Sequence, residues 1–73
     1  MPYVQISMIA GRTDEQKEAL LRAVHNAVEE SLGVPADAIR VWISEFGLNE
    51  FISGGKTAAD RRAEREAEQA VAS

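Results

Sequence analysis

The chain has 73 residues, no cysteine and one histidine, and its formal net charge is −4 at pH 7. Because a chain of this size buries only about 60% of its unfolded surface, a single small core stabilises it weakly. The cysteine and histidine counts exclude disulfides and a Cys/His metal site, so oligomerisation is the expected means of stabilisation. The acidic balance, without a basic stripe interleaved with aromatics, argues against nucleic acid as a partner.

A membrane location is not expected either. No apolar run approaches the roughly 18 residues that a membrane-spanning helix needs. The opening segment MPYVQISMIAG lacks the basic region that begins a secretory signal peptide. The composition therefore predicts a soluble, cytoplasmic protein with no membrane partner.

The first predicted element is a strand over residues 3–9, where side chains alternate in character. One face consists of Val4, Ile6 and Met8. The opposite face includes Gln5 and Ser7 and is more polar, so we expect the strand to bury mainly one side.

A helix is expected to follow the first strand. Thr13 and Gln16 have the spacing of a capping box, in which each side chain accepts a hydrogen bond from the other residue's backbone N–H. Apolar residues at steps of three and four continue the helical pattern as far as Leu32. Gly33 can adopt the left-handed conformation that ends a helix, and Pro35 cannot continue one.

After a short turn, a second strand is expected over residues 39–45. Its inward face consists of Ile39, Val41 and Ile43. A strand, a helix of about 20 residues and a second strand have the length of a right-handed crossover, so the two strands should be parallel. The fold class is therefore α/β (α+β), a short βαβ unit whose uncovered sheet face other subunits should cover. Trp42 is expected to pack at such an interface.

The remaining chain is predicted to form a loop or short hairpin and then a charged tail. The segment FGLNEFISGGK contains three glycines, and Gly54–Gly55 is interpreted as a turn with positive φ rather than a phosphate-binding loop. Residues 57–73 are rich in Ala, Glu and Arg, with charged side chains at i,i+4 spacing. We expect one domain over residues 2–56 and a peripheral, helical tail over residues 57–73.

Pro2 is the first residue of chemical interest, because it directly follows the initiator methionine. A small second residue favours removal of Met1, which leaves Pro2 as a secondary amine at the chain start. Burial and nearby cations disfavour the charged form of an amine, so Pro2 could act as a general base near neutral pH. The structural alternative, that proline merely starts an edge strand, is favoured by position alone.

Two arginines stand at the ends of the predicted strands. Arg12 follows the first strand and Arg40 begins the second. Arginine binds carboxylates through two parallel hydrogen bonds, so this pair near a base would select a small dianion. The alternative is that each forms an ordinary surface ion pair.

His25 has no second histidine, cysteine or paired carboxylate at ligand spacing, and we interpret it as structural or exposed. The chain also lacks a Ser/His/Asp order, a Walker loop and a GxGxxG segment. The sequence motifs therefore favour neither a metal site nor a nucleotide site.

Together these features resemble the 4-oxalocrotonate (2-hydroxymuconate) tautomerase family, in the tautomerase superfamily. The resemblance covers residues 2–62. It runs through Pro2, VQI at 4–6, GRTDEQKEAL at 11–20, the LGVP helix stop, RVWISE at 40–45 and FISGG at 51–55. An N-terminal proline, GRT-x-EQK and a later R-V-x-I-x-E form a specific combination in so short a chain.

The resemblance implies a cofactor-independent isomerase that converts 2-hydroxymuconate, or a similar 2-hydroxydienoate, to the 2-oxo-3-enoate. Pro2 would be the general base, and no metal would take part. Arg12 would bind the distal carboxylate of this small diacid. Arg40 would hold the carboxylate and 2-oxygen at the other end, where negative charge develops in the transition state.

The resemblance also implies apolar residues around the substrate and a multi-chain site. Phe51 would keep the pocket apolar, with Ile9 and Phe46 beside it; Phe46 replaces what is often a smaller residue in the family. Family members build each site from neighbouring chains, usually in a homohexamer of three dimers.

Two other functions remain open. The same site could add water to a 3-haloacrylate or another unsaturated acid, which needs a carboxylate near Phe51; the chain offers Glu50 beside it. Alternatively, the chain could be a binding module that uses this scaffold without turnover, an interpretation that a retained Met1 or a pocket filled by Phe46 would favour.

Overall fold

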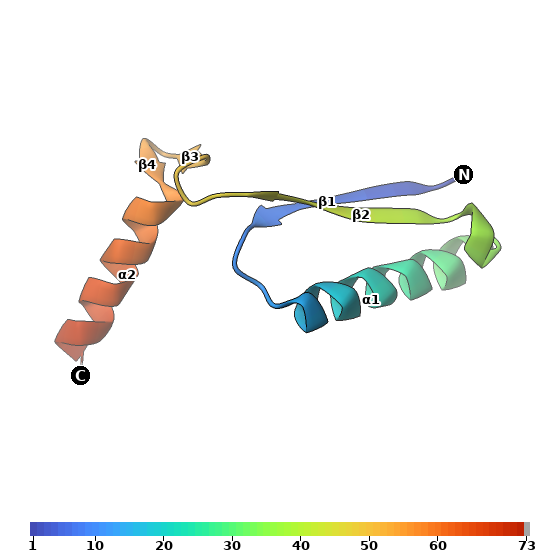
Figure 1. Cartoon of the computed structure of the whole chain (residues 1–73), viewed down its shortest axis with the longest axis horizontal. Coiled ribbons are helices and arrows are strands. Elements are labelled where there is room, and N and C mark those ends of the chain that lie inside the picture. Colours follow the sequence, from blue (N-terminus) through green and yellow to red (C-terminus); the bar gives the residue numbers. More distant parts are fainter. Residues whose placement is uncertain (73) are drawn as a thin grey trace.

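A computed structural model describes residues 1–72, and a parallel βαβ unit forms its larger part (Figure 1). The unit consists of β1 (Tyr3–Ile9), α1 (Asp14–Leu32), the 3-10 turn η1 (Ala36–Ala38) and β2 (Arg40–Phe46). Beyond it lie β3 (Ile52–Ser53), β4 (Lys56–Thr57) and α2 (Ala58–Ala72). Of the tail predicted over 57–73, Ser73 lies outside the described residues.

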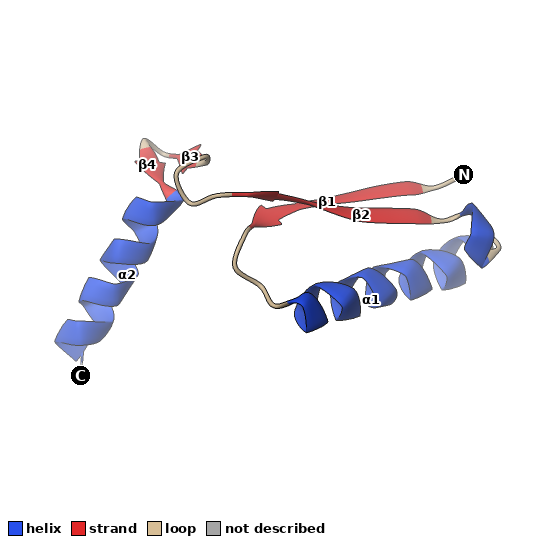
Figure 2. Ribbon diagram, viewed as in Figure 1, coloured by secondary structure: helices blue, strands red, loops and turns tan. Residues whose placement is uncertain are grey.

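The two long strands pair in parallel, as predicted. Their register runs from Tyr3 opposite Arg40 to Ile9 opposite Phe46. Helix α1 lies along one side of this strand pair, and no helix or strand of the described residues covers the other side (Figure 2). The strand β2 begins one residue later than predicted, because the N–H of Ile39 donates to the carbonyl of Ala36 and ends the 3-10 turn.

The caps of α1 are those that the sequence predicted. The Thr13 Oγ1 accepts from the Gln16 N–H at 3.1 Å, and the Thr13 N–H donates to Gln16 Oε1 at 3.0 Å. At the other end, Gly33 has φ 65° and its N–H donates to the carbonyl of Glu29. These local hydrogen bonds satisfy backbone groups that a helix end otherwise leaves unpaired.

A two-residue turn at Gly54 and Gly55, with φ of 61° and 78°, connects the short antiparallel strands β3 and β4. Both values lie in the left-handed region that glycine adopts without strain. The start of α2 follows at once and is capped reciprocally: the Thr57 N–H donates to Asp60 Oδ2, and the Asp60 N–H donates to Thr57 Oγ1, each at 3.1 Å. The sequence interpretation did not identify this second capping box, although Thr57 and Asp60 have the T-x-x-D spacing that is typical of one.

Very little of the chain is fully buried. Among the described residues, only Ile39 and Ala58 are buried apolar side chains. Large apolar side chains remain exposed on the open side of the sheet, including Tyr3 at 65% and Trp42 at 43%. Within residues 1–72, no helix is long and apolar enough to cross a membrane. The single chain therefore leaves apolar surface of the kind that marks an interface.

Candidate active site

Pro2 and Arg40 lie side by side at one end of the strand pair. The Arg40 N–H donates to the carbonyl of Pro2 at 3.1 Å. The Arg40 side chain turns back along η1, where Nη1 donates to the carbonyls of Asp37 at 2.5 Å and Ile39 at 3.2 Å. Pro2 is half-buried and Arg40 is exposed. The backbone of Arg40 is thus next to Pro2, while its guanidinium is held by carbonyl oxygens at and next to η1.

The remaining predicted site residues gather at the other end. Ile9 pairs with Phe46 in the sheet register, and the rings of Phe46 and Phe51 stack with centroids 5.3 Å apart. Ile9 and Arg12 line a hollow of about 320 Å³, to which Leu48, from the loop between Phe46 and Phe51, also contributes. The hollow is bounded by Met8, Ile9, Ala10, Gly11, Arg12, Leu48, Ala58, Arg62 and Arg65. It combines an apolar floor with three guanidinium groups.

A single chain keeps these two groups apart. Strand β1 has seven residues, which at about 3.3 Å per residue separate its ends by roughly 20 Å. Pro2 is thus at the opposite end of the strand from Arg12 and Phe51. A small diacid therefore does not reach both groups within one chain.

Two carboxylates at the Arg12 end of the sheet, those of Glu45 and Glu50, form hydrogen bonds with other residues. Glu50 Oε1 accepts from the Gly47 N–H at 2.7 Å, which closes the turn after β2. Glu45 Oε1 accepts from Lys17 Nζ at 3.1 Å, and this hydrogen bond is the main cause that raises the pKa of Lys17 above its ordinary value. The hollow beside Arg12 therefore has basic and apolar lining residues and no carboxylate among them.

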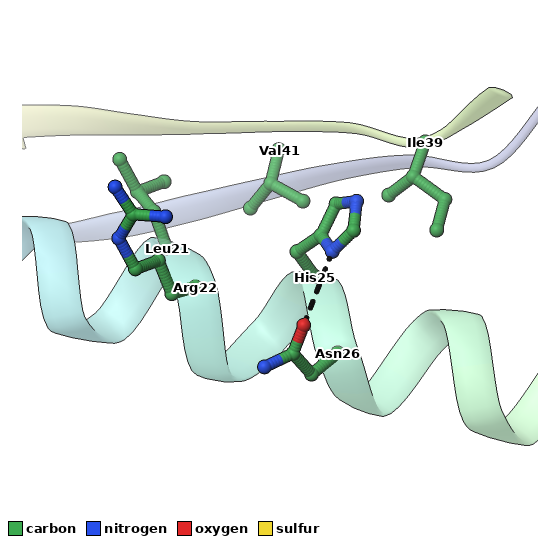
Figure 3. Close-up of a pocket in the computed structure, with 6 residues that line it drawn as sticks. All are labelled: Leu21, Arg22, His25, Asn26, Ile39 and Val41. Atoms are coloured by element: carbon green, nitrogen blue, oxygen red, sulfur yellow. Dashed lines mark hydrogen bonds between the residues drawn. The ribbon is translucent and has the colours of Figure 1, made fainter. Parts of the chain in front are cut away.

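A second hollow, of about 450 Å³, lies between α1 and β2 (Figure 3). Its lining includes His25, which is half-buried beneath Ile39 and Val41 and has Nδ1 3.4 Å from Asn26 Oδ1. Among residues 1–72, no group of three His, Cys, Asp or Glu side chains is placed to hold a metal ion. His25 thus lies between α1 and β2, where Ile39 and Val41 are its apolar neighbours in the hollow.

The sequence interpretation missed that Arg62 and Arg65 line the same hollow as Arg12. Both were assigned to a peripheral tail, yet both line the hollow that contains Arg12. Their i,i+3 spacing, which places two side chains on one face of a helix, was the available signal. The direction in which α2 leaves the hairpin could not be inferred from that spacing.

A parallel βαβ unit with a proline at its start, an arginine at each end of the strand pair and an aromatic cluster defines a small tautomerase-type α+β protein. The model of the family described as "Tautomerase enzyme" matches residues 2–61. The chain belongs to this family.

Individual relatives agree with the family match. The chain is 47% identical over 62 residues to a 2-hydroxymuconate tautomerase of Pseudomonas sp. (strain CF600), covering 85% of this chain and 98% of that protein. It is 46% identical over 61 residues to a probable tautomerase of Bacillus cereus, covering 84% of this chain and all of that protein. Among solved structures, a 4-oxalocrotonate tautomerase isozyme from Methylibium petroleiphilum superposes with a TM-score of 0.82 at 40% identity, covering 86% and 98% of the two chains. These matches support an isomerase with the α+β tautomerase fold.

Proposed function

We propose that this tautomerase converts 2-hydroxymuconate, or a similar 2-hydroxydienoate, to its 2-oxo-3-enoate isomer without a metal or organic cofactor. The observation that carries the proposal is the main-chain hydrogen bond from Arg40 to Pro2, which places the expected base and the residue that carries the anion-binding group at the same end of the sheet. The relative from Pseudomonas sp. named 2-hydroxymuconate tautomerase supports the choice of substrate.

Removal of Met1 is the first requirement, because the nitrogen of Pro2 has no basicity while it forms a peptide bond. The Met1 side chain is 71% exposed, and proline is a small second residue, so the chain start suits enzymatic trimming. The cation of Arg40 then favours the neutral form of the new amine. A neutral secondary amine can accept a proton from the substrate.

In the proposed reaction, the Pro2 nitrogen takes the proton of the substrate 2-hydroxyl and returns a proton to a carbon of the conjugated chain. The electron pair of the O–H bond becomes part of the new carbonyl, and the double bonds shift along the chain. Negative charge gathers on the 2-oxygen during transfer, where Arg40 stabilises it. Arg12 holds the distal carboxylate, and Phe51, Ile9 and Phe46 exclude water.

The assembly we propose is a homo-oligomer, with a cytoplasmic hexamer as the expected form. Two chains placed antiparallel along their sheets would bring the Pro2 end of one against the Arg12 and Phe51 end of its partner. The exposed Tyr3 and Trp42 on the open sheet face support further contacts between copies. A neighbouring structure in the family, 33% identical with a TM-score of 0.78 and covering 82% and 97% of the two chains, is described as a heterohexamer from Chloroflexus aurantiacus.

The test is the decay of 2-hydroxymuconate absorbance, recorded with protein whose intact mass is measured in the same preparation. Rapid conversion by the Met1-free form, and none by a form that keeps Met1, is the expected result. No conversion by a Met1-free protein would contradict the proposal.

Hydration of unsaturated acids is less well supported. It needs a carboxylate near Phe51, and the candidate, Glu50, instead accepts a hydrogen bond from the Gly47 N–H in the turn after β2.

A further inference from the structure

Three arginines converge on the hollow at the distal end of the proposed site, although one suffices for a single carboxylate. Arg12 comes from the link between β1 and α1, whereas Arg62 and Arg65 come from α2. That link and α2 extend from the same end of the strand pair (Figure 1). The hollow is formed within one chain and does not depend on a second copy.

The position of α2 is set by contacts outside the helix. The Ala58 N–H donates to the carbonyl of Phe51 at 3.1 Å, and the Ala59 N–H donates to the carbonyl of Leu48 at 3.2 Å. Arg61 Nη2 donates to the carbonyl of Ser53 at 2.7 Å, and Ala58 is only 7% exposed. The first turns of α2 are thus anchored to the loop after β2, which directs the following arginines toward Arg12.

The charges in the hollow are uncompensated. Within residues 1–72, Arg12, Arg62 and Arg65 form neither an ion pair nor a hydrogen bond. Their lining neighbours Met8, Leu48 and Ala58 are apolar. Three like charges held together repel one another, and an anion with more than one negative charge relieves this repulsion.

Arg62 and Arg65 also lie outside the residues that the family model matches, which end at 61. Arg62 is the next residue, and Arg65 lies one helical turn beyond it. The extra charge in the hollow is thus contributed by the part of the chain beyond the family match.

We propose that Arg65, together with Arg62, forms a second carboxylate-binding position beside Arg12, so that acids with two carboxylates at the distal end bind more tightly than acids with one. Arg12 binds one carboxylate and the α2 arginines bind the second, since a guanidinium matches a carboxylate with two parallel hydrogen bonds. The apolar floor contacts the carbon chain between them. This preference deepens the proposed function and rests on Arg12 being the distal carboxylate site.

The experiment compares two unreactive acids, propane-1,2,3-tricarboxylate and pentanedioate, by titration calorimetry on the Met1-free protein. We expect the tricarboxylate to bind about tenfold tighter, because its additional carboxylate gains a charge-assisted pair. Arg65→Gln should remove most of this preference, and Arg62→Gln should remove part of it. Arg22→Gln, which deletes a positive charge on α1 outside this hollow, is the matched control and should preserve the preference.

Equal affinities of the wild-type protein for both acids would overturn the inference, as would an unchanged preference in both α2 variants. A preference lost equally in Arg22→Gln would also overturn it, because net charge rather than position would then be responsible. Turnover of 2-hydroxymuconate on the same preparations tests the proposed function separately. Absent turnover with the preference intact refutes the reaction and leaves the binding inference standing.

Discussion

The backbone N–H of Arg40 donates to the carbonyl of Pro2 at 3.1 Å, so the first residue of β2 is bonded to the residue that precedes β1. Residues 38 positions apart in the chain therefore share one end of the sheet. Because this contact belongs to the main chain, it survives replacement of either side chain. A variant at Pro2 thus reports on chemistry more than on folding, whereas a variant at Arg40 also loses the side-chain hydrogen bonds to Asp37 and Ile39.

Replacing the proposed base tests the reaction directly. We expect Pro2→Ala to keep the fold and lose about 100-fold or more in turnover, because a primary amine has a different basicity and position. Initial rates with 2-hydroxymuconate and the circular dichroism spectrum give the two readouts. Wild-type rates in a Met1-free Pro2→Ala protein would remove Pro2 from the mechanism.

The two arginines proposed for the substrate should differ in their kinetic signatures. Arg40→Ala is expected to lower kcat by about 100-fold, because charge develops on the 2-oxygen only as the proton moves. Arg12→Ala is expected chiefly to raise KM, because a distal carboxylate is bound equally in ground and transition states. Steady-state kinetics on both variants checks this, and a pure KM effect in Arg40→Ala would contradict the assignment.

The ion pair between Lys17 and Glu45 joins the first turn of α1 to β2. The hydrogen bond to Glu45 raises the pKa of Lys17 in the folded chain above its ordinary value of 10.5. A raised lysine pKa stabilises the fold fully below the unfolded value, and this contribution is lost as pH rises through the folded value.

We therefore expect Lys17→Met to lower Tm slightly at pH 8, with a difference from the wild type that shrinks as the pH rises through the raised pKa of Lys17. Thermal melts across this range measure it. Glu45→Gln is the matched control and should show a similar loss at pH 8. A Tm difference that grows with alkalinity would contradict the pairing.

Gly33 ends α1 with a φ of 65°, where a side chain is strained. No atom lies within 4 Å of the position that a Cβ would occupy, so the effect of substitution is conformational. Gly33→Ala is expected to lower the free energy of unfolding by about 1 kcal/mol, and Gly33→Asn by less, because asparagine tolerates this conformation. Urea unfolding of the two variants compares them, and equal losses would argue against the left-handed cap.

Local features of this fold were readable from the amino-acid order. The alternation in residues 3–9 predicted β1, and the Thr13–Gln16 box and Gly33 predicted both ends of α1, because a strand face and a helix cap depend on neighbouring residues. The parallel pairing of β1 and β2 followed from the length of the connection. The candidate residues Pro2 and Arg12 were likewise recognised through short motifs.

Other features were decided by contacts between distant segments. The register that brings Arg40 to Pro2, and the hydrogen bond from Ala59 to Leu48 that helps direct α2 toward Arg12, join residues whose separation carries no local pattern. The charged tail was therefore predicted to be peripheral, although in the fold Arg65 lines the hollow beside Arg12. Sequence determined the elements and the chemical groups available, whereas tertiary hydrogen bonding decided which of those groups meet.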